Sequence, residues 1–97
     1  MFIEILRSFA ENTPEELDKL RDVNETNLPL YAIDIHTIKG VSASIGAKEI
    51  SVRAKGLEKM AKDGNLSGIL AENDDLISDA EALVASIQEW LAANAPG

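Results

Sequence analysis

Hydrophobic residues recur along the chain at the three- and four-residue spacing of helices, and almost no stretch alternates as a strand does. The clearest stripe lies near the C-terminus, where a 3-4-3-4 spacing is typical of a helix in a bundle. Short stretches between the stripes favour antiparallel neighbours. We therefore expect one all-α domain over residues 1–97, an antiparallel up-and-down four-helix bundle with a short extra N-terminal helix. The expected helices cover about residues 2–11, 14–22, 28–45, 47–63 and 74–93.

Capping and stop signals set these boundaries. Residues 13–16 (Thr-Pro-Glu-Glu) form a capping box with proline in the first helical position, which predicts that a new helix begins there. Asn27 is placed to cap the next helix. Gly46 and residues 64–65 (Gly-Asn) predict helix ends. Residues 66–72 are expected to form only a helical turn or two before the last helix begins.

Charge is distributed unevenly along the chain. The net charge of −8 disfavours nucleic acid as a partner, because its phosphates would be repelled. Residues 39–62 nevertheless carry six basic side chains against two acidic ones, whereas residues 63–97 carry seven acidic side chains and no basic one. We call residues 39–62 the basic island. By itself it is either a solvated helix face or a surface for an acidic partner.

Missing features exclude several classes of protein. The chain has no cysteine, which excludes a disulfide scaffold, a thiolate metal site and a cysteine nucleophile. No apolar run approaches the roughly 18–20 residues of a membrane span. Residues 1–10 have neither the basic start nor the cleavage site of a signal peptide. We therefore expect a cytoplasmic domain without direct membrane contact.

The single histidine, His36, falls in the middle of the expected helix 28–45. At about 100° per residue, the apolar Ile38, Val41 and Ile45 lie on the opposite side of that helix. A lone histidine is usually structural, but a core histidine would lie among these apolar residues. His36 is instead expected to face solvent.

The positions beside His36 are unusual. Ala32, Gly40 and Ala43 are very small. Glycine inside a helix costs about 1 kcal/mol relative to alanine, so Gly40 indicates close approach by another molecule. Lys39 places a cation beside the imidazole and attracts an anionic group. Together these residues favour an acceptor of an anionic group over a proton shuttle.

Other chemistries lack the residues they need. One histidine without cysteines cannot build a zinc site from protein ligands alone, and a haem-binding bundle needs an inward histidine and a second ligand. No serine has the spacing of a catalytic triad, and no glycine-rich phosphate loop is present. Asp34 lies on the far side of the helix and cannot orient the ring. Its place within the apolar side has no explanation in the sequence pattern.

Two runs resemble the histidine phosphotransfer (HPt) domain family: His-Thr-Ile-Lys-Gly-Val-Ser-Ala-Ser-Ile-Gly-Ala over residues 36–47 and Ala-Lys-Gly-Leu-Glu over residues 54–58. The family pattern is a histidine, two residues, Lys-Gly, a Gly-Ala helix break and an Ala-x-x-Leu-Glu helix. Residues 9–17 also resemble its N-terminal helices. The resemblance implies a phosphocarrier without an ATP site of its own. It takes a phosphoryl group from a receiver aspartyl phosphate and passes it to a response-regulator aspartate.

The resemblance also implies roles for individual residues. His36 would accept the phosphoryl group at Nε2, Lys39 would stabilise the phosphoryl oxygens, and Gly40 would leave room for the receiver. The family places a polar residue, often glutamine, against the other ring nitrogen, and here that position is Glu58. Glu58 either accepts a hydrogen bond from Nδ1 or repels the phosphoryl group, and both alternatives stay open. The expected receiver contacts are Ala32, Ile33, Ala43, Lys55, Glu58 and Lys62.

The implied partners are the receiver domains of response regulators and of a hybrid sensor kinase. The basic island would steer an acidic receiver toward His36. We expect no cofactor or metal of the chain's own, with Mg²⁺ supplied by the receiver, and a working monomer. An excised domain of a hybrid kinase, at the cytoplasmic end of a membrane-anchored protein, is favoured because Met1 enters the first helix at once. The alternatives are a chemotaxis-type kinase domain and a non-catalytic receiver-binding bundle, which usually lacks the histidine.

Overall fold

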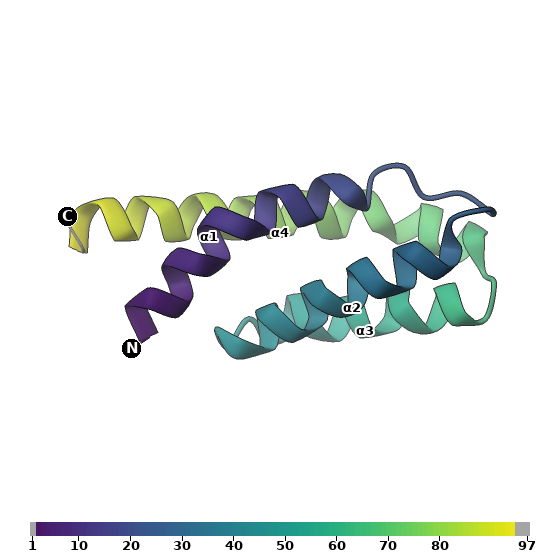
Figure 1. Cartoon of the computed structure of the whole chain (residues 1–97), viewed down its shortest axis with the longest axis horizontal. Helices are drawn as coiled ribbons and strands as arrows, with labels where there is room; N and C mark the ends of the chain where they lie inside the picture. The colour runs from purple at the N-terminus through teal and green to yellow at the C-terminus, as the bar shows by residue number, and fades with distance from the viewer. Residues whose placement is uncertain (1, 95–97) are drawn as a thin grey trace.

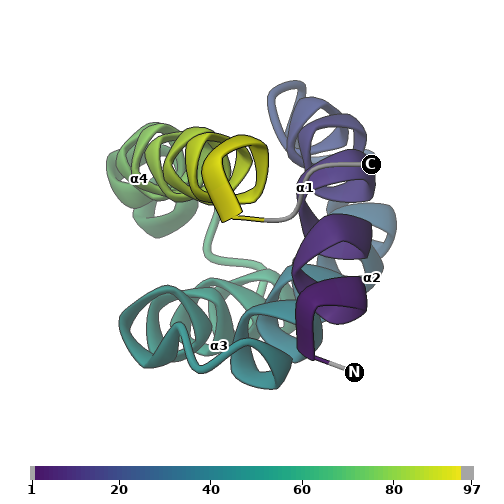
Figure 2. The ribbon, with the colours of Figure 1, turned by 90° about the vertical axis from the view of Figure 1, so that its left-hand side faces the viewer.

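Four helices pack as an antiparallel bundle, which confirms the expected fold class. The computed structural model describes residues 2–94. Figure 1 shows the four helices lying lengthwise, and the end view in Figure 2 places α1 and α3 beside both α2 and α4. The helices are α1 (Phe2–Lys19), α2 (Leu28–Ser44), α3 (Lys48–Lys62) and α4 (Leu66–Asn94).

The core follows the apolar stripes of the sequence. The predicted seam of the last helix is buried at Ile77, Ala80, Val84 and Ile87. The larger cluster joins all four helices, while a smaller one packs Phe9 and its neighbours in α1 against α4. The first residues of α1 and the last residues of α4 lie at the same end of the bundle (Figure 1). Burial of these stripes is the main driving force for assembling the bundle.

One correction concerns the N-terminal region, where α1 is a single helix and not two. It continues through Pro14, so the capping box of residues 13–16 does not begin a new helix. The ring of Pro14 faces solvent, and Phe9 and Leu17 are buried on either side of it. Their burial outweighs the cost of an interior proline, which removes one hydrogen bond and bends the helix. Figure 1 shows the first half of α1 slanting away from the axis of its second half.

A second correction concerns α4, which is one helix of 29 residues where a short turn and a separate helix were expected. Asn65 begins it as an N-cap: its Oδ1 accepts a hydrogen bond from the backbone N–H of Gly68 at 3.0 Å. The polar stretch that suggested a start at Asp74 contains Asn73, which is 3% exposed. A polar residue is buried at position 73 because its side chain makes hydrogen bonds with Tyr31 and Leu20, in other parts of the bundle.

The predicted stops at Gly46 and Gly64 are confirmed. Both residues have positive φ, 79° and 72°, a conformation that glycine adopts without strain. Asn27 occupies the N-cap position of α2, but its side chain makes no cap hydrogen bond. Its Oδ1 accepts from the backbone N–H of Asn24 at 2.8 Å, and its Nδ2 donates to the carbonyl of Asp22 at 2.7 Å. It therefore braces the preceding loop.

A buried polar chain ties three helices together. Tyr31 of α2 donates its hydroxyl hydrogen to Asn73 Oδ1 at 2.7 Å. Asn73 Nδ2 donates to the carbonyl of Leu20, the residue directly after α1, at 2.8 Å. Burial raises the pKa of Tyr31, which keeps it a neutral donor. None of the helices in residues 2–94 has the length and apolar character that crossing a bilayer requires.

Asp34 is half-buried, and the arrangement of α2 explains why. The buried side chains of α2 are Tyr31, Ile35, Ile38 and Ser42. At 100° per residue their arc centres about 130° from His36 and not directly opposite it. Asp34 therefore lies at the edge of the buried arc, where its carboxylate keeps access to water.

Candidate functional site

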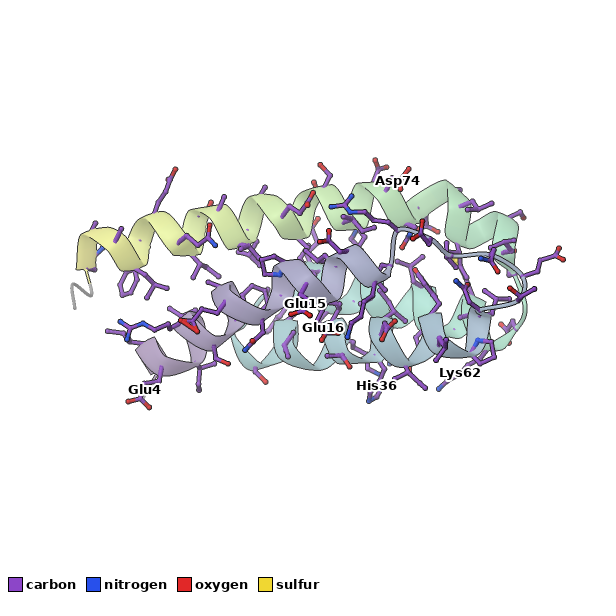
Figure 3. All side chains as sticks on the ribbon, turned by 45° about the horizontal axis from the view of Figure 1, so that its top comes forward. Glu4, Glu15, Glu16, His36, Lys62 and Asp74 are labelled. Carbon is purple, nitrogen blue, oxygen red and sulfur yellow. The ribbon has the colours of Figure 1, made fainter. Side chains whose placement is uncertain are left out.

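His36 lies in the middle of α2 and projects out of the bundle. Its side chain is 62% exposed, as the sequence pattern predicted. Figure 3 shows it pointing to the same side of the molecule as Lys62, while Asp74 lies on the other side. The imidazole is therefore open to a protein partner.

Glu58 of α3 contacts His36 and the lysines beside it. It is 6% exposed. Its Oε2 lies 2.9 Å from His36 Nδ1 and 3.3 Å from Lys62 Nζ, and its Oε1 lies 2.6 Å from Lys39 Nζ. One buried carboxylate thus holds the histidine and two lysines. The contact between Glu58 and Nδ1, one of the two alternatives left by the sequence, is present in the structure.

The charge of Glu58 fixes which ring nitrogen of neutral His36 carries the proton. Lys39 most of all, together with hydrogen bonds from His36 and Lys62, lowers the pKa of Glu58 from 4.5 to about 2 against the opposing effect of burial. Near neutral pH the carboxylate can only accept hydrogen bonds. Nδ1 must therefore be the donor in the neutral imidazole, which leaves the lone pair of Nε2 free. Nε2 is the nitrogen available to a partner.

Lys39 is held between α2 and α3. Its side chain is 27% exposed and is anchored on Glu58. Its backbone carbonyl accepts a hydrogen bond from the hydroxyl of Ser51, in α3, at 3.0 Å. Ser51 is not predicted from the sequence, because a serine on a helix face gives no signal of such a contact. This bond fixes α3 against α2 within one turn of His36.

Gly40 is exposed, and the fold does not require a glycine there. A Cβ added at this position would meet no atom within 4 Å. Internal packing therefore does not explain the glycine. The interpretation that Gly40 leaves room for an approaching molecule is consistent with this open surface.

The other expected contact residues fall into two groups. Ile33, Ala43 and Lys55 are exposed. Ala32 is half-buried against the core, and Glu58 is buried beneath His36. Glu58 thus supports the histidine from below and offers little surface for docking.

Several basic side chains of the basic island form ion pairs within the domain. Arg53 Nη1 lies 2.6 Å from Asp79 Oδ2 in α4, and Lys59 pairs with Asp63. Arg53 and Lys59 of the basic island are thus paired with carboxylates, and both pairs keep access to solvent. Across residues 2–94 no group of three His, Cys, Asp or Glu side chains is arranged to hold a metal ion.

Leu30 is an apolar residue of this surface that the sequence pattern does not predict. Leu30 is 65% exposed and lies one helical turn before Ile33, which is 63% exposed. Two large apolar side chains on the exposed side of one helix are the signal that could have identified it.

Comparison with known protein families agrees with the resemblance carried by the histidine motif. The family described as "Hpt domain" matches residues 4–93, nearly the whole chain. No curated protein and no solved structure gives a match. The chain thus belongs to the Hpt domain family, the phosphotransfer domains of two-component phosphorelays, which interact with receiver domains.

Proposed function

We propose that His36 takes a phosphoryl group from the aspartyl phosphate of a receiver domain and passes it to an aspartate of a response regulator. The observation that carries this proposal is the pairing of an exposed imidazole with a buried, ionised carboxylate. Nδ1 of His36 lies 2.9 Å from Glu58 Oε2, so Nε2 faces solvent as a nucleophile. Family membership supports the same assignment.

Transfer to His36 exchanges one bond to phosphorus for another. Nε2 attacks the phosphorus, the bond from phosphorus to the aspartyl oxygen breaks, and the aspartate leaves as a carboxylate. Nδ1 keeps its proton, and the negative charge of Glu58 offsets the positive charge on the phosphorylated ring. Attack on Nε2-bound phosphorus by another aspartate reverses these changes and delivers the group onward.

Lys39 and Lys62 are the candidate residues for binding the phosphoryl oxygens. Both ammonium groups contact the carboxylate that holds His36. The arrival of a phosphoryl group on Nε2 adds a second negative centre to the site. We propose that the lysines then share their charge between Glu58 and the phosphoryl oxygens. The receiver supplies the Mg²⁺ at its own phosphorylation site, so positioning and charge stabilisation are the contributions of this chain.

The proposal concerns this domain whether it stands alone or forms part of a larger protein, and it includes the cytoplasmic location expected from the sequence. Its direct test is phosphoryl transfer from receivers charged with acetyl phosphate and Mg²⁺. A phosphate-affinity gel should show label on the wild-type domain, lost in acid and kept in base, and none on His36→Gln. An absence of label across a panel of receivers, with the bundle shown to be folded by circular dichroism, would refute phosphotransfer. A non-catalytic receiver-binding domain would then remain.

The role of Glu58 as a positioning residue can be separated from a purely structural one. Glu58→Ala should slow transfer about 10- to 100-fold, because both ring tautomers become populated. Glu58→Gln should recover much of that rate, since its amide oxygen can still accept from Nδ1. Nitrogen-15 NMR of the imidazole reports the tautomer directly. A mixed tautomer in the wild type, or equal rates for both variants, would contradict this role.

Gly40 provides a test of access. Gly40→Ala should stabilise the fold by about 1 kcal/mol, because alanine favours the helix and no atom opposes its Cβ. It should nevertheless lower the transfer rate from a receiver, while labelling by phosphoramidate, a small phosphoryl donor, stays unchanged. Gly56→Ala, in the interior of α3, is the matched control. If Gly40→Ala leaves receiver transfer intact, the access role is wrong.

A further inference from the structure

A groove lies between α1 and α2, directly beside the residue that follows His36. Its volume is about 420 Å³. Its α2 wall begins at Thr37, and its α1 wall runs from Glu4 to Glu16. The first half of α1 slants toward the C-terminal end of α2 (Figure 1). The groove is lined by Glu4, Ile5, Ser8, Phe9, Asn12, Thr13, Glu16, Thr37, Val41, Ser44 and Ile45.

The groove and His36 share one continuous surface. At 100° per residue, Thr37 and Val41 lie about 100–140° around α2 from His36. Ile33 and Gly40 lie on the part of α2 between His36 and these two residues, and both are exposed. A stable interface covers about 800 Å² on each partner. A domain with that footprint that docks on His36 is large enough to reach the groove as well.

The groove combines an apolar floor with an acidic rim. Ile5 is 45% exposed at its edge, and the other large apolar side chains lie deeper. Among the described residues that line it, Glu4 and Glu16 are acidic and none is basic. Lys19 approaches Glu16 Oε1 from outside the groove, at 3.3 Å. The lining matches an apolar side chain that carries positive charge nearby.

The side of His36 toward α3 has the opposite charge. Lys39 and Lys62 lie there, on Glu58. A partner thus meets cations on one side of the histidine and carboxylates on the other. Such a pair of unlike patches fixes the orientation of a partner and discriminates among related ones.

We propose that the groove between α1 and α2 selects the receiver, by accepting an apolar side chain flanked by lysine or arginine on the receiver surface. The proposal rests on the proposed function, because its occupant is the receiver that exchanges the phosphoryl group with His36. Receivers that carry acidic residues at that position are disfavoured by Glu4 and Glu16.

The test reverses the charge of the groove. Glu4→Lys/Glu16→Lys should lower kcat/KM for transfer from a cognate receiver about tenfold, through KM. Asp74→Lys/Asp75→Lys makes the same charge change at exposed positions of α4, and Asp74 lies on the other side of the molecule from His36 (Figure 3). This control should stay within twofold of the wild type. Labelling of all three proteins by phosphoramidate should be equal, since that donor does not use the groove.

The outcomes separate the two proposals. Equal losses in the groove variant and its control would mean that only net charge matters, and unchanged kinetics in the groove variant would also overturn the groove proposal. Phosphoramidate labelling without transfer from any receiver would instead overturn the proposed function, and the groove proposal with it. A receiver whose lysine or arginine beside the apolar side chain is changed to glutamate should transfer its phosphoryl group efficiently to Glu4→Lys/Glu16→Lys. If the charge-swapped receiver does not restore transfer to the groove variant, the groove proposal is wrong.

Discussion

At the scale of single residues, Glu58 determines how the domain responds to acid. Its pKa is about 2 in the folded protein against an ordinary value of 4.5. A lowered pKa contributes stability that is fully present above about pH 4.5 and is lost as the pH falls toward 2. The wild type should therefore lose free energy of unfolding across this interval.

Urea unfolding at a series of pH values measures this loss. Glu58→Gln cannot titrate, so its stability should change less between about pH 5 and pH 2. Glu72→Gln, at an exposed position of α4, is the control and should follow the wild type. If Glu58→Gln and the wild type lose stability in parallel, Glu58 does not carry the acid response.

Ser42 is a buried polar residue without a hydrogen bond. Its Oγ has no partner within the described structure, and the residue is 0% exposed. Ser42→Ala should raise the free energy of unfolding by about 1 kcal/mol, because it removes an unsatisfied hydroxyl. Ser44→Ala, two residues on and exposed, is the comparison and should change stability by less than about 0.5 kcal/mol. A loss of stability in Ser42→Ala would indicate a hydrogen bond that the static structure does not contain.

At the scale of elements, the glycines that end helices behave differently from the glycines inside them. Gly46 has φ +79° between α2 and α3, whereas Gly56 lies in the interior of α3. Gly46→Ala should cost about 1–2 kcal/mol of stability, because the left-handed region strains a side chain. Gly56→Ala should add up to about 1 kcal/mol, because no atom lies within 4 Å of its Cβ. Thermal melts of the pair should shift in opposite directions, and a shift in the same direction would contradict this account.

The same contrast shows which element boundaries a sequence can reveal. Helix ends at Gly46 and Gly64 are visible because the cause, a positive φ, is local. The unbroken course of α1 through Pro14 is not visible, because burial of side chains before and after the proline decides it. Residues 66–94 form one helix for a similar reason: the polar side chain of Asn73 is buried in the bundle, where it makes hydrogen bonds with Tyr31 and the carbonyl of Leu20.

At the scale of the whole molecule, Asn73 links segments that are far apart in the sequence. It contacts Tyr31 and the carbonyl of Leu20, in two other parts of the bundle. Asn73→Ala should lower the free energy of unfolding by about 2–4 kcal/mol, because it leaves two buried polar groups without partners. Tyr31→Phe should cost less, about 1–2 kcal/mol, since Asn73 keeps its bond to Leu20. Urea unfolding should give these losses without a change in m-value, and a cost for Asn73→Ala no larger than for Tyr31→Phe would disprove the link.

Several features follow from the sequence alone because their causes are local or periodic. Apolar spacing predicts the helices and their buried sides, and the placement of His36 opposite most of that stripe predicts its exposure. The histidine motif with Lys39 and Gly40 predicts the family. These conclusions need no knowledge of which helix packs against which.

Only the tertiary structure decides what surrounds the histidine. The sequence leaves the effect of Glu58 open, because a glutamate 22 residues away can hold the ring or repel the phosphoryl group. Packing of α3 against α2 buries Glu58 and places its carboxylate on Nδ1, and the lysine contacts keep it ionised. The groove arises in the same way, since α1 meets α2 only after the chain has folded. Both depend on distances between helices, and a one-dimensional pattern does not contain those distances.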